Sequence, residues 1–313
     1  MRNIIIAICL PAALALPLTA IAAPAVPATL ILPTVKTAPV MDGTLNDPVW
    51  KKAQVLELSE KAMPLRPAIP GAKTALLLLA GEDNQLYLGF DCPFPPAYPP
   101  KGRERERDAP VFEDECAEIF IAPDGRPNAE GYYHFAVNVQ GSATERKGLD
   151  PAWNVDWGRV VRLDKDRWTA TLTVPLTPLV DGDASGHYWR IGACRDVYDA
   201  NGSFVQGMML TRPGYYHPGV AVIVGPVKAR TLLAAVDEAL AEVDAPTRPL
   251  LRGAMKRQNE RLMECRATLS ASLDAAIGAK EAVAILDTAL ANAGKRKNMV
   301  LWNALFDESH RKE

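Results

Sequence analysis

Between residues 34 and 227, apolar and polar positions alternate in short runs that are separated by Gly, Pro, Asp and Asn. Two of these runs flank a turn at residues 82–84, and two more flank a turn at residues 164–166, which is the pattern of β-hairpins. Helical periodicity does not interrupt the runs, which excludes a fold of alternating strands and helices. The pattern therefore predicts a mainly β fold, an antiparallel β-sandwich of the jelly-roll type.

The pattern changes after residue 227, where Ala, Leu and Glu become frequent. Apolar residues such as Leu262, Cys265 and Leu269 then recur at intervals of three and four, as on one face of a helix. A further amphipathic segment ends at Gly294, a residue that often follows a helix. Residues 228–313 are therefore predicted to form an α-helical hairpin or three-helix appendage, for which docking of a protein partner is one role that stays open.

Residues 1–22 have the layout of a signal peptide. Arg2 supplies the positive charge at the start, residues 4–18 are apolar, and small residues follow at the cleavage position. The apolar run is shorter than the roughly 20 residues that span a bilayer. We therefore expect a secreted or periplasmic protein with no membrane span in the mature chain, in which an Ala/Pro-rich linker over 23–33 precedes the β domain at 34–227.

The charge of the chain bears on its partners, and its cysteines bear on possible disulfides. The 313 residues carry a formal net charge of -2, without the basic surface that a nucleic-acid partner requires. The cysteines that remain after cleavage are Cys92, Cys116, Cys194 and Cys265. Four cysteines allow three pairings. A bond between Cys92 and Cys116, at the ends of two predicted strands, is the pairing that we prefer, and buried free thiols are the alternative.

The segment RDAPVFEDECAEIFIAPDG, residues 107–125, places five carboxylates before an apolar run. If its second half is a strand, Ala117, Ile119 and Ile121 face the core while Glu118 lies on the opposite face. A carboxylate in apolar surroundings needs a partner, so Glu118 is either held in a structural ion pair or used in recognition. The other four carboxylates are expected in a loop where solvent or a cation accounts for them: Asp108, Glu113, Asp114 and Glu115.

Three more sites in the sequence could bind a ligand. In GYYHFAVN, alternation puts Tyr133 inward and His134 and Asn138 on the other face. Trp153 and Trp157 are four positions apart and are either core residues or a stacking platform for a sugar ring. Carboxylates in loops beside strands also suit a structural calcium ion, and the candidate ligands are Asp42, Asp47, Asp108 and Asp114.

Seven segments together resemble the family 9 carbohydrate-binding modules in content and order. They read VMDGTLNDPVWKKA, LYLGFDC, RDAPVFEDECAEIFIAPDG, YYHFAVNVQG, WNVDW, WTATLTVPLTPL and WRIGACRD, and the resemblance covers roughly residues 34–227. The resemblance implies a β-sandwich that binds a poly- or oligosaccharide, needs no cofactor and uses calcium, if at all, for structure. The ligand-binding residues that it carries over are Arg107, Glu118, Tyr133, His134, Asn138, Trp153 and Trp157.

Our leading functional prediction is a non-catalytic carbohydrate-binding protein that serves carbohydrate catabolism. The sequence contains no GxSxG, P-loop or HExxH motif. Two alternatives stay open. A glycoside hydrolase would use two carboxylates of the 108–118 region. A haem-binding or other ligand-binding sandwich would use Met63, Met208 or His134 as axial ligands.

Overall fold

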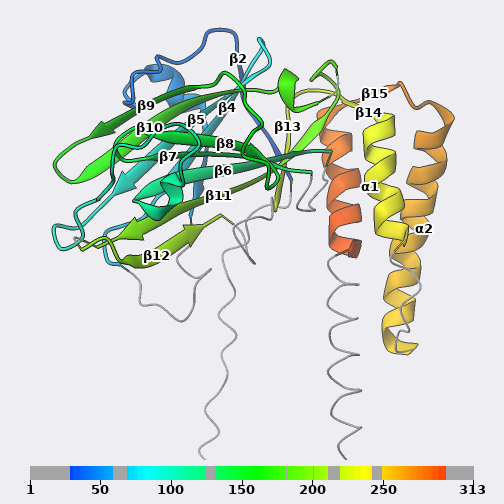
Figure 1. Ribbon diagram of the computed structural model, residues 1–313. Helices are drawn as coiled ribbons and strands as arrows, with labels where there is room; N and C mark the ends of the chain where they lie inside the picture. The colour runs from blue at the N-terminus through cyan, green and yellow to red at the C-terminus, as the bar shows by residue number, and fades with distance from the viewer. Residues whose placement is uncertain are drawn as a thin grey trace, which may run out of the picture.

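Two β-sheets stacked face to face and a group of helices at one end make up the structure, a computed structural model (Figure 1). It describes residues 29–58, 69–124, 131–180, 182–199, 201–210, 219–241 and 249–293. The expected signal peptide lies outside the described residues. This architecture confirms the predicted fold class.

One sheet has seven strands, in the order β1-β13-β11-β6-β7-β8, with β12 paired to β11. Their bounds are β1 Thr29–Ile31, β6 Cys116–Pro123, β7 Tyr133–Asn138, β8 Ala143–Lys147, β11 Tyr188–Tyr198, β12 Phe204–Met209 and β13 Val220–Ile223. β1 pairs with β13 in parallel, whereas the other pairs of this sheet are antiparallel. Residues 29–31 therefore belong to the sandwich, and the predicted linker over 23–33 is wrong for these positions.

The second sheet has six strands, in the order β2-β4-β5-β10-β9, with β3 paired to β4. Their bounds are β2 Thr34–Val35, β3 Gln54–Glu57, β4 Ala75–Gly81, β5 Gln85–Pro93, β9 Gly158–Leu163 and β10 Arg167–Pro175. The turns between β4 and β5 and between β9 and β10 are the two predicted hairpin turns. β2 pairs with β4 in parallel, so each sheet is mixed at one edge and not purely antiparallel as predicted.

The main core lies between the two sheets. Leu78 and Phe90 enter it from the six-stranded sheet, and Ile119 and Phe135 enter it from the seven-stranded sheet. Ala117 and Ile121 accompany Ile119, as the alternation along this strand predicted. The same alternation leaves the side chains of Glu118 and His134 on the outer face of the seven-stranded sheet.

A buried ion pair crosses this core, and it involves a residue that we expected in solvent. Glu115 is fully buried, and its Oε1 atom accepts hydrogen bonds from Arg195 Nε at 2.7 Å and from Trp168 Nε1 at 3.0 Å. Arg195 also donates to Thr74 Oγ1 and to the carbonyl of Pro93. The expectation that Glu115 belongs to a solvated loop is therefore wrong, because its side chain points to the core face that it shares with Ala117.

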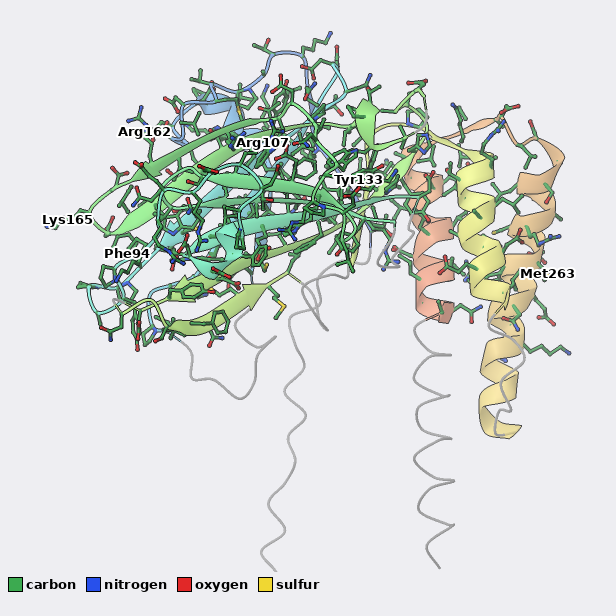
Figure 2. The ribbon with its side chains drawn as sticks, viewed as in Figure 1. Phe94, Arg107, Tyr133, Arg162, Lys165 and Met263 are labelled. Carbon is green, nitrogen blue, oxygen red and sulfur yellow. The ribbon has the colours of Figure 1, made fainter. Side chains whose placement is uncertain are left out.

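Helices cover one end of the outer face of the seven-stranded sheet. They are α1 (Ala229–Ala241), α2 (Pro249–Ala271) and a helix over 279–293, and the short strands β14 (Val227–Lys228) and β15 (Ala276–Ile277) join them to the sandwich. Leu232 and Leu286 of the helices pack against Tyr188 and Ile223 of the sheet. Lys165 and Met263 mark opposite ends of the molecule (Figure 2). Within the described ranges, the helices are too short or too polar to cross a membrane.

The segment between β2 and β3, residues 36–53, covers the outer face of the six-stranded sheet, and we call it the opening segment. The 3-10 helix η1 (Pro48–Lys52) begins after Asp47, whose carboxylate accepts a hydrogen bond from Val49 N, and it places Trp50 against Leu79 and Tyr87. Two further 3-10 helices are η3 (Val111–Glu113) and η4 (Thr177–Leu179). Among the described residues, the helices cover one end of the seven-stranded sheet's outer face, and a pocket lies over its middle.

Candidate functional site

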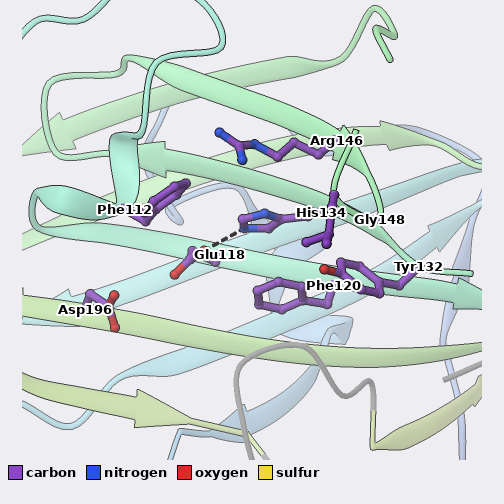
Figure 3. Close-up of a pocket in the computed structure, with 9 residues that line it drawn as sticks. Phe112, Glu118, Phe120, Tyr132, His134, Arg146, Gly148 and Asp196 are labelled. Atoms are coloured by element: carbon purple, nitrogen blue, oxygen red, sulfur yellow. Dashed lines mark hydrogen bonds and ion pairs between the residues drawn. The ribbon is translucent and has the colours of Figure 1, made fainter. Parts of the chain in front are cut away.

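A pocket of about 260 Å³ lies on the outer face of the seven-stranded sheet, over β6, β7, β8 and β11 (Figure 3). Strands contribute most of its walls, because alternate residues of neighbouring strands point to the same face. The 3-10 helix η3 and the loop after β8 add its rim. The lining residues are Phe112, Glu118, Phe120, Tyr132, His134, Arg146, Gly148, Leu149 and Asp196. We call this feature the outer-face pocket.

Glu118 and His134 form a buried pair in the outer-face pocket. The Nε2 atom of His134 lies 2.6 Å from Glu118 Oε2, and 4% of Glu118 and 5% of His134 are exposed. The ring of His134 stacks on Phe120, with centroids 4.4 Å apart and planes inclined by 11°. The carboxylate therefore has the partner that its apolar surroundings demand, and the imidazole is fixed by one hydrogen bond and one ring contact.

At the rim of the pocket, Phe112 supplies an aromatic ring and Arg146 supplies a positive charge. Phe112, on η3, is partly exposed, and the guanidinium carbon of Arg146 lies 5.3 Å from the centre of its ring. This is the geometry of a cation–π contact. Arg146 lies on β8 directly opposite His134 on β7, so the strand register brings both side chains to the pocket. The rim can thus offer a ring and planar hydrogen-bond donors to the same ligand.

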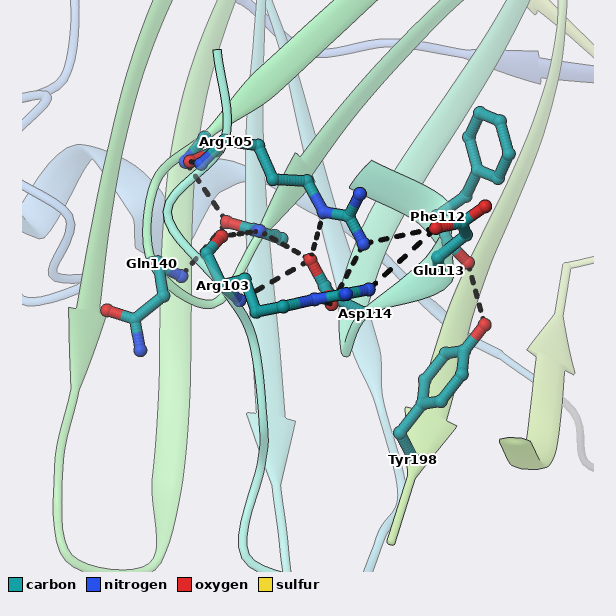
Figure 4. A network of polar contacts seen from close by, with 9 residues as sticks. Arg103, Arg105, Phe112, Glu113, Asp114, Gln140 and Tyr198 are labelled. Atoms are coloured by element: carbon teal, nitrogen blue, oxygen red, sulfur yellow. Dashed lines mark hydrogen bonds and ion pairs between the residues drawn. The ribbon is translucent and has the colours of Figure 1, made fainter. Parts of the chain in front are cut away.

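The loop that carries Phe112 is held by polar contacts (Figure 4). Arg105 Nε lies 2.6 Å from one carboxylate oxygen of Asp114, and Arg103 Nε lies 3.1 Å from the other. Tyr198 Oη donates to the carbonyl of Phe112 at 2.8 Å. Burial acts to raise the pKa of Asp114, but hydrogen bonds from both arginines outweigh it and hold that pKa below its usual range. These contacts order the pocket rim before any ligand binds.

The structure places only two of the predicted ligand-binding residues, Glu118 and His134, in the outer-face pocket. Asn138 is buried beside it and serves the chain itself. Its amide nitrogen donates to the carbonyl of Arg103 and to Asp114, and its oxygen accepts from Gln140 N and Ser142 N. These contacts tie the turn between β7 and β8 to the loop before β6.

The other four predicted residues lie on the inner side of the same sheet, around Glu145. Trp157 Nε1 donates to Glu145 Oε2 at 3.0 Å, and Arg107 pairs with the other carboxylate oxygen. Trp153 packs against Tyr133 at a centroid distance of 4.8 Å and against Phe135. Trp157 is 5% exposed and Tyr133 is 6% exposed. These rings pack at the margin of the core, separate from the outer-face pocket, and their role in ligand binding stays a prediction.

Three of the four aspartates predicted to bind calcium, Asp42, Asp47 and Asp114, accept hydrogen bonds from the chain itself, and calcium binding stays a prediction. Both oxygens of Asp114 accept from arginines, whose charge opposes a cation. Asp42 accepts from Thr44, and Asp47 accepts from Val40 N and Val49 N, so both stabilise turns of the opening segment. A calcium ion needs six to eight oxygens around one point. Among the described residues, no three acidic side chains of the loop before β6 or of the opening segment meet at one point.

The two alternative functions receive no support from this arrangement. Of the carboxylates at 108–118, only Glu118 lines the outer-face pocket, since Glu113 and Asp114 pair with arginines and Glu115 is in the core. Met208 is buried between the sheets whereas His134 is on the outer face, so the two cannot ligate one haem. Met63 lies outside the described residues.

The preferred disulfide between Cys92 and Cys116 is wrong. Cys92 is in the core between the sheets, whereas Cys116 is on the outer face that it shares with Glu118. All four cysteines of the described residues are free. Burial raises the pKa of the Cys92 thiol to about 12, so this group is protonated and inert in the folded protein.

Sequence reasoning did not assign several pocket residues to ligand binding: Phe112 and Phe120 of the same segment as Glu118, and Arg146, Leu149 and Asp196 from other parts of the chain. Alternation along β8 and β11 would place Arg146 and Asp196 on the outer face. Their proximity to Glu118 follows only from the strand order, because β11 and β6 are neighbours although 60 or more residues separate them in the chain.

Comparisons with known proteins give fold likenesses at low identity. No family model matches the chain, and no curated protein sequence matches it. A family 9 carbohydrate-binding module from Caldicellulosiruptor kristjanssonii, in complex with cellotriose, has a TM-score of 0.48 and 14% identity over 63% of this chain and 93% of that one. The complex of such a module with glucose gives 0.47 and 15%, over 63% and 95% of the two chains.

A third similar structure is a protein from Bacteroides uniformis that is described as carbohydrate-binding. It has a TM-score of 0.48 and 14% identity, over 62% of this chain and 97% of that one. The first two structures belong to the family that the sequence motifs resemble.

Proposed function

We propose that this protein binds an oligo- or polysaccharide in the outer-face pocket and has no catalytic activity of its own. One observation carries the proposal: aromatic rings and planar charged groups from four strands and one 3-10 helix line a single pocket. Sugar rings present an apolar C–H face and a rim of hydroxyl groups. Binding sites for them therefore combine ring surfaces with carboxylate, imidazole and guanidinium groups.

The chemistry of each lining residue supports this ligand class. Phe112 is the partly exposed ring on which a sugar could stack, while Phe120 and Tyr132 are buried and shape the floor. Glu118 supplies acceptors, and Arg146 supplies paired donors that match vicinal hydroxyl oxygens or a sugar carboxylate. The pocket holds about 260 Å³, which suits one or two sugar units rather than a long chain segment.

Binding to a panel of plant and bacterial oligosaccharides, followed by calorimetry, tests the proposal. We expect Phe112→Ala and Arg146→Ala each to weaken binding about 10- to 100-fold, as anchors of a pocket do. Phe94→Ala is the matched control, because Phe94 is a partly buried ring outside the pocket. A folded protein that binds no glycan of the panel, or whose affinity is unchanged in both pocket variants, contradicts the proposal.

The same proposal includes export and a role in carbohydrate catabolism. The support is the signal-peptide layout of residues 1–22. Expression of the full chain in a bacterium, followed by fractionation and N-terminal sequencing, should recover a chain that begins near residue 23 outside the cytoplasm. Recovery of the uncleaved chain in the cytoplasm would count against export and leave the binding proposal to its own test.

A further inference from the structure

Four side chains with metal-binding atoms meet on the outer face beside the pocket. β6 and β11 are antiparallel neighbours, with Cys116 opposite Asp196 and Glu118 opposite Cys194. Residues opposite one another in a sheet share a face, so the register forms a square of two thiols and two carboxylates. We call these residues, Cys116, Glu118, Cys194 and Asp196, the thiol–carboxylate cluster.

Three members of the thiol–carboxylate cluster, Cys116, Glu118 and Asp196, have the spacing of ligands around one small ion, and Cys194 adjoins them through Glu118. Donor atoms of Cys116, Glu118 and Asp196 all lie within 4.8 Å of one another. Glu118 Oε1 is 3.1 Å from Cys194 Sγ and 4.0 Å from Cys116 Sγ. In a tetrahedral zinc site with Zn–S near 2.3 Å and Zn–O near 2.1 Å, sulfur and oxygen ligands are about 3.6 Å apart. The two observed distances lie on either side of that value.

The position of Glu118 in the cluster also suits a metal ligand. Its Oε1 atom faces the sulfur atoms, while its Oε2 atom is held by His134 Nε2 at 2.6 Å. Metal-binding carboxylates and imidazoles are commonly oriented by such a second hydrogen bond. His134 therefore acts as a positioning residue for the carboxylate.

Electrostatics favour a cation in the thiol–carboxylate cluster. All four side chains are buried, and Arg195, the adjacent residue on β11, points to the opposite face and pairs with Glu115. A divalent ion would displace the protons of the two thiols to solvent, and its charge would balance that of the thiolates and carboxylates.

We propose that the thiol–carboxylate cluster binds a zinc ion, or a divalent cation of similar softness, at the side of the outer-face pocket. Two thiolates select such an ion over calcium or magnesium, which prefer oxygen ligands. Glu118 and Asp196 also line the pocket, so the bound ion would stiffen its floor. The metal proposal is independent of the proposed saccharide binding, because the sulfur ligand Cys116 does not line the pocket.

Equilibrium dialysis of untagged, chelator-treated full-length protein against zinc chloride, with elemental analysis, tests this proposal. We expect one zinc ion per chain. The double variant Cys116→Ser/Cys194→Ser should lose this ion, while Cys265→Ser, which alters a cysteine on α2, should keep it. His134→Gln should weaken zinc binding about 10- to 100-fold, as expected for loss of a residue that orients a ligand.

Cobalt(II) gives a second readout that needs no substitution. Bound to the thiol–carboxylate cluster, it should show sulfur-to-cobalt charge-transfer absorption and the strong visible bands of a tetrahedral site. Only the weak bands of an octahedral oxygen site, or zinc binding that survives in a folded double variant, would overturn the proposal. The proposal would also be overturned if the protein bound no zinc while its thiols were free, or if Cys116 and Cys194 formed a disulfide. Saccharide affinity measured on the double variant separates this failure from failure of the binding function.

Discussion

Removal of the charge on Glu115 should destabilise the sandwich far more than its place in an acidic segment suggests. Glu115 and Arg195 are each about 1% exposed, and Oε1 of Glu115 lies 2.7 Å from the guanidinium. In Glu115→Gln the arginine stays charged and buried without its counterion. Loss of one partner of a buried pair costs about 3–5 kcal/mol. Because Arg195 keeps hydrogen bonds to Thr74 and Pro93, we expect the lower end, about 3 kcal/mol.

Urea unfolding followed by tryptophan fluorescence measures this change, since Trp168 donates a hydrogen bond to the altered group. With a slope of roughly 3 kcal/mol per molar urea, the midpoint should fall by about 1 M. Glu113→Gln is the matched control, because the Glu113 side chain is 58% exposed and its surface ion pairs contribute little. Equal midpoints for Glu115→Gln and Glu113→Gln would refute the reasoning, as would a double variant Glu115→Leu/Arg195→Met that recovers none of the loss.

Other predictions concern acid, thiols and calcium. The lowered pKa of Asp114 means that its ion pairs add stability above its unfolded pKa of 3.8 and that this stability is lost as pH falls through the folded value. The stability deficit of Asp114→Asn should therefore be present near neutral pH and shrink as the solution is acidified through and below the unfolded pKa. In metal-free protein, a thiol reagent should modify Cys265 first and reach Cys92, Cys116 and Cys194 only on unfolding; early modification of all four contradicts the burial. Added calcium should leave the melting temperature unchanged, and a rise would show that the predicted aspartates, or others, bind the ion.

Much of the fold follows from short-range patterns. The hairpin turns at 82–84 and 164–166, the inward set Ala117, Ile119 and Ile121, and the helical region after residue 228 all depend on alternation or periodicity within one segment. Such signals survive in the sequence because each strand buries one face. The mixed sheet edges do not follow from them, since β1 and β2 are only three and two residues long.

The site was predictable only in part, because it depends on strand order. Alternation placed Glu118 and His134 on the outer face, and the structure brings them within 2.6 Å. Asp196 and Cys194 reach Glu118 through the pairing of β11 with β6, which no local pattern encodes. Trp153 and Trp157 share a sequence signal that serves equally for a core ring and a binding ring. The structure packs both at the core margin, where Trp157 hydrogen-bonds to Glu145.

The helical region keeps one prediction open. Its helices pack on β11 and β13 through Tyr188 and Ile223, so the region is continuous with the sandwich and not a separate tail. A protein partner for these helices stays a prediction. Pull-down experiments with variants of exposed residues on α2, such as Met263→Glu, would test it without disturbing the buried side of the helix.

A crystal structure of the protein soaked with an oligosaccharide selected from the glycan panel tests the central claim most directly. We predict that a sugar ring lies in the outer-face pocket, against Phe112, with hydroxyl groups within hydrogen-bond distance of Glu118 or Arg146. Density for the sugar beside Trp153 and Glu145, with the outer-face pocket unoccupied, would contradict this account and assign binding to the other side of the sheet.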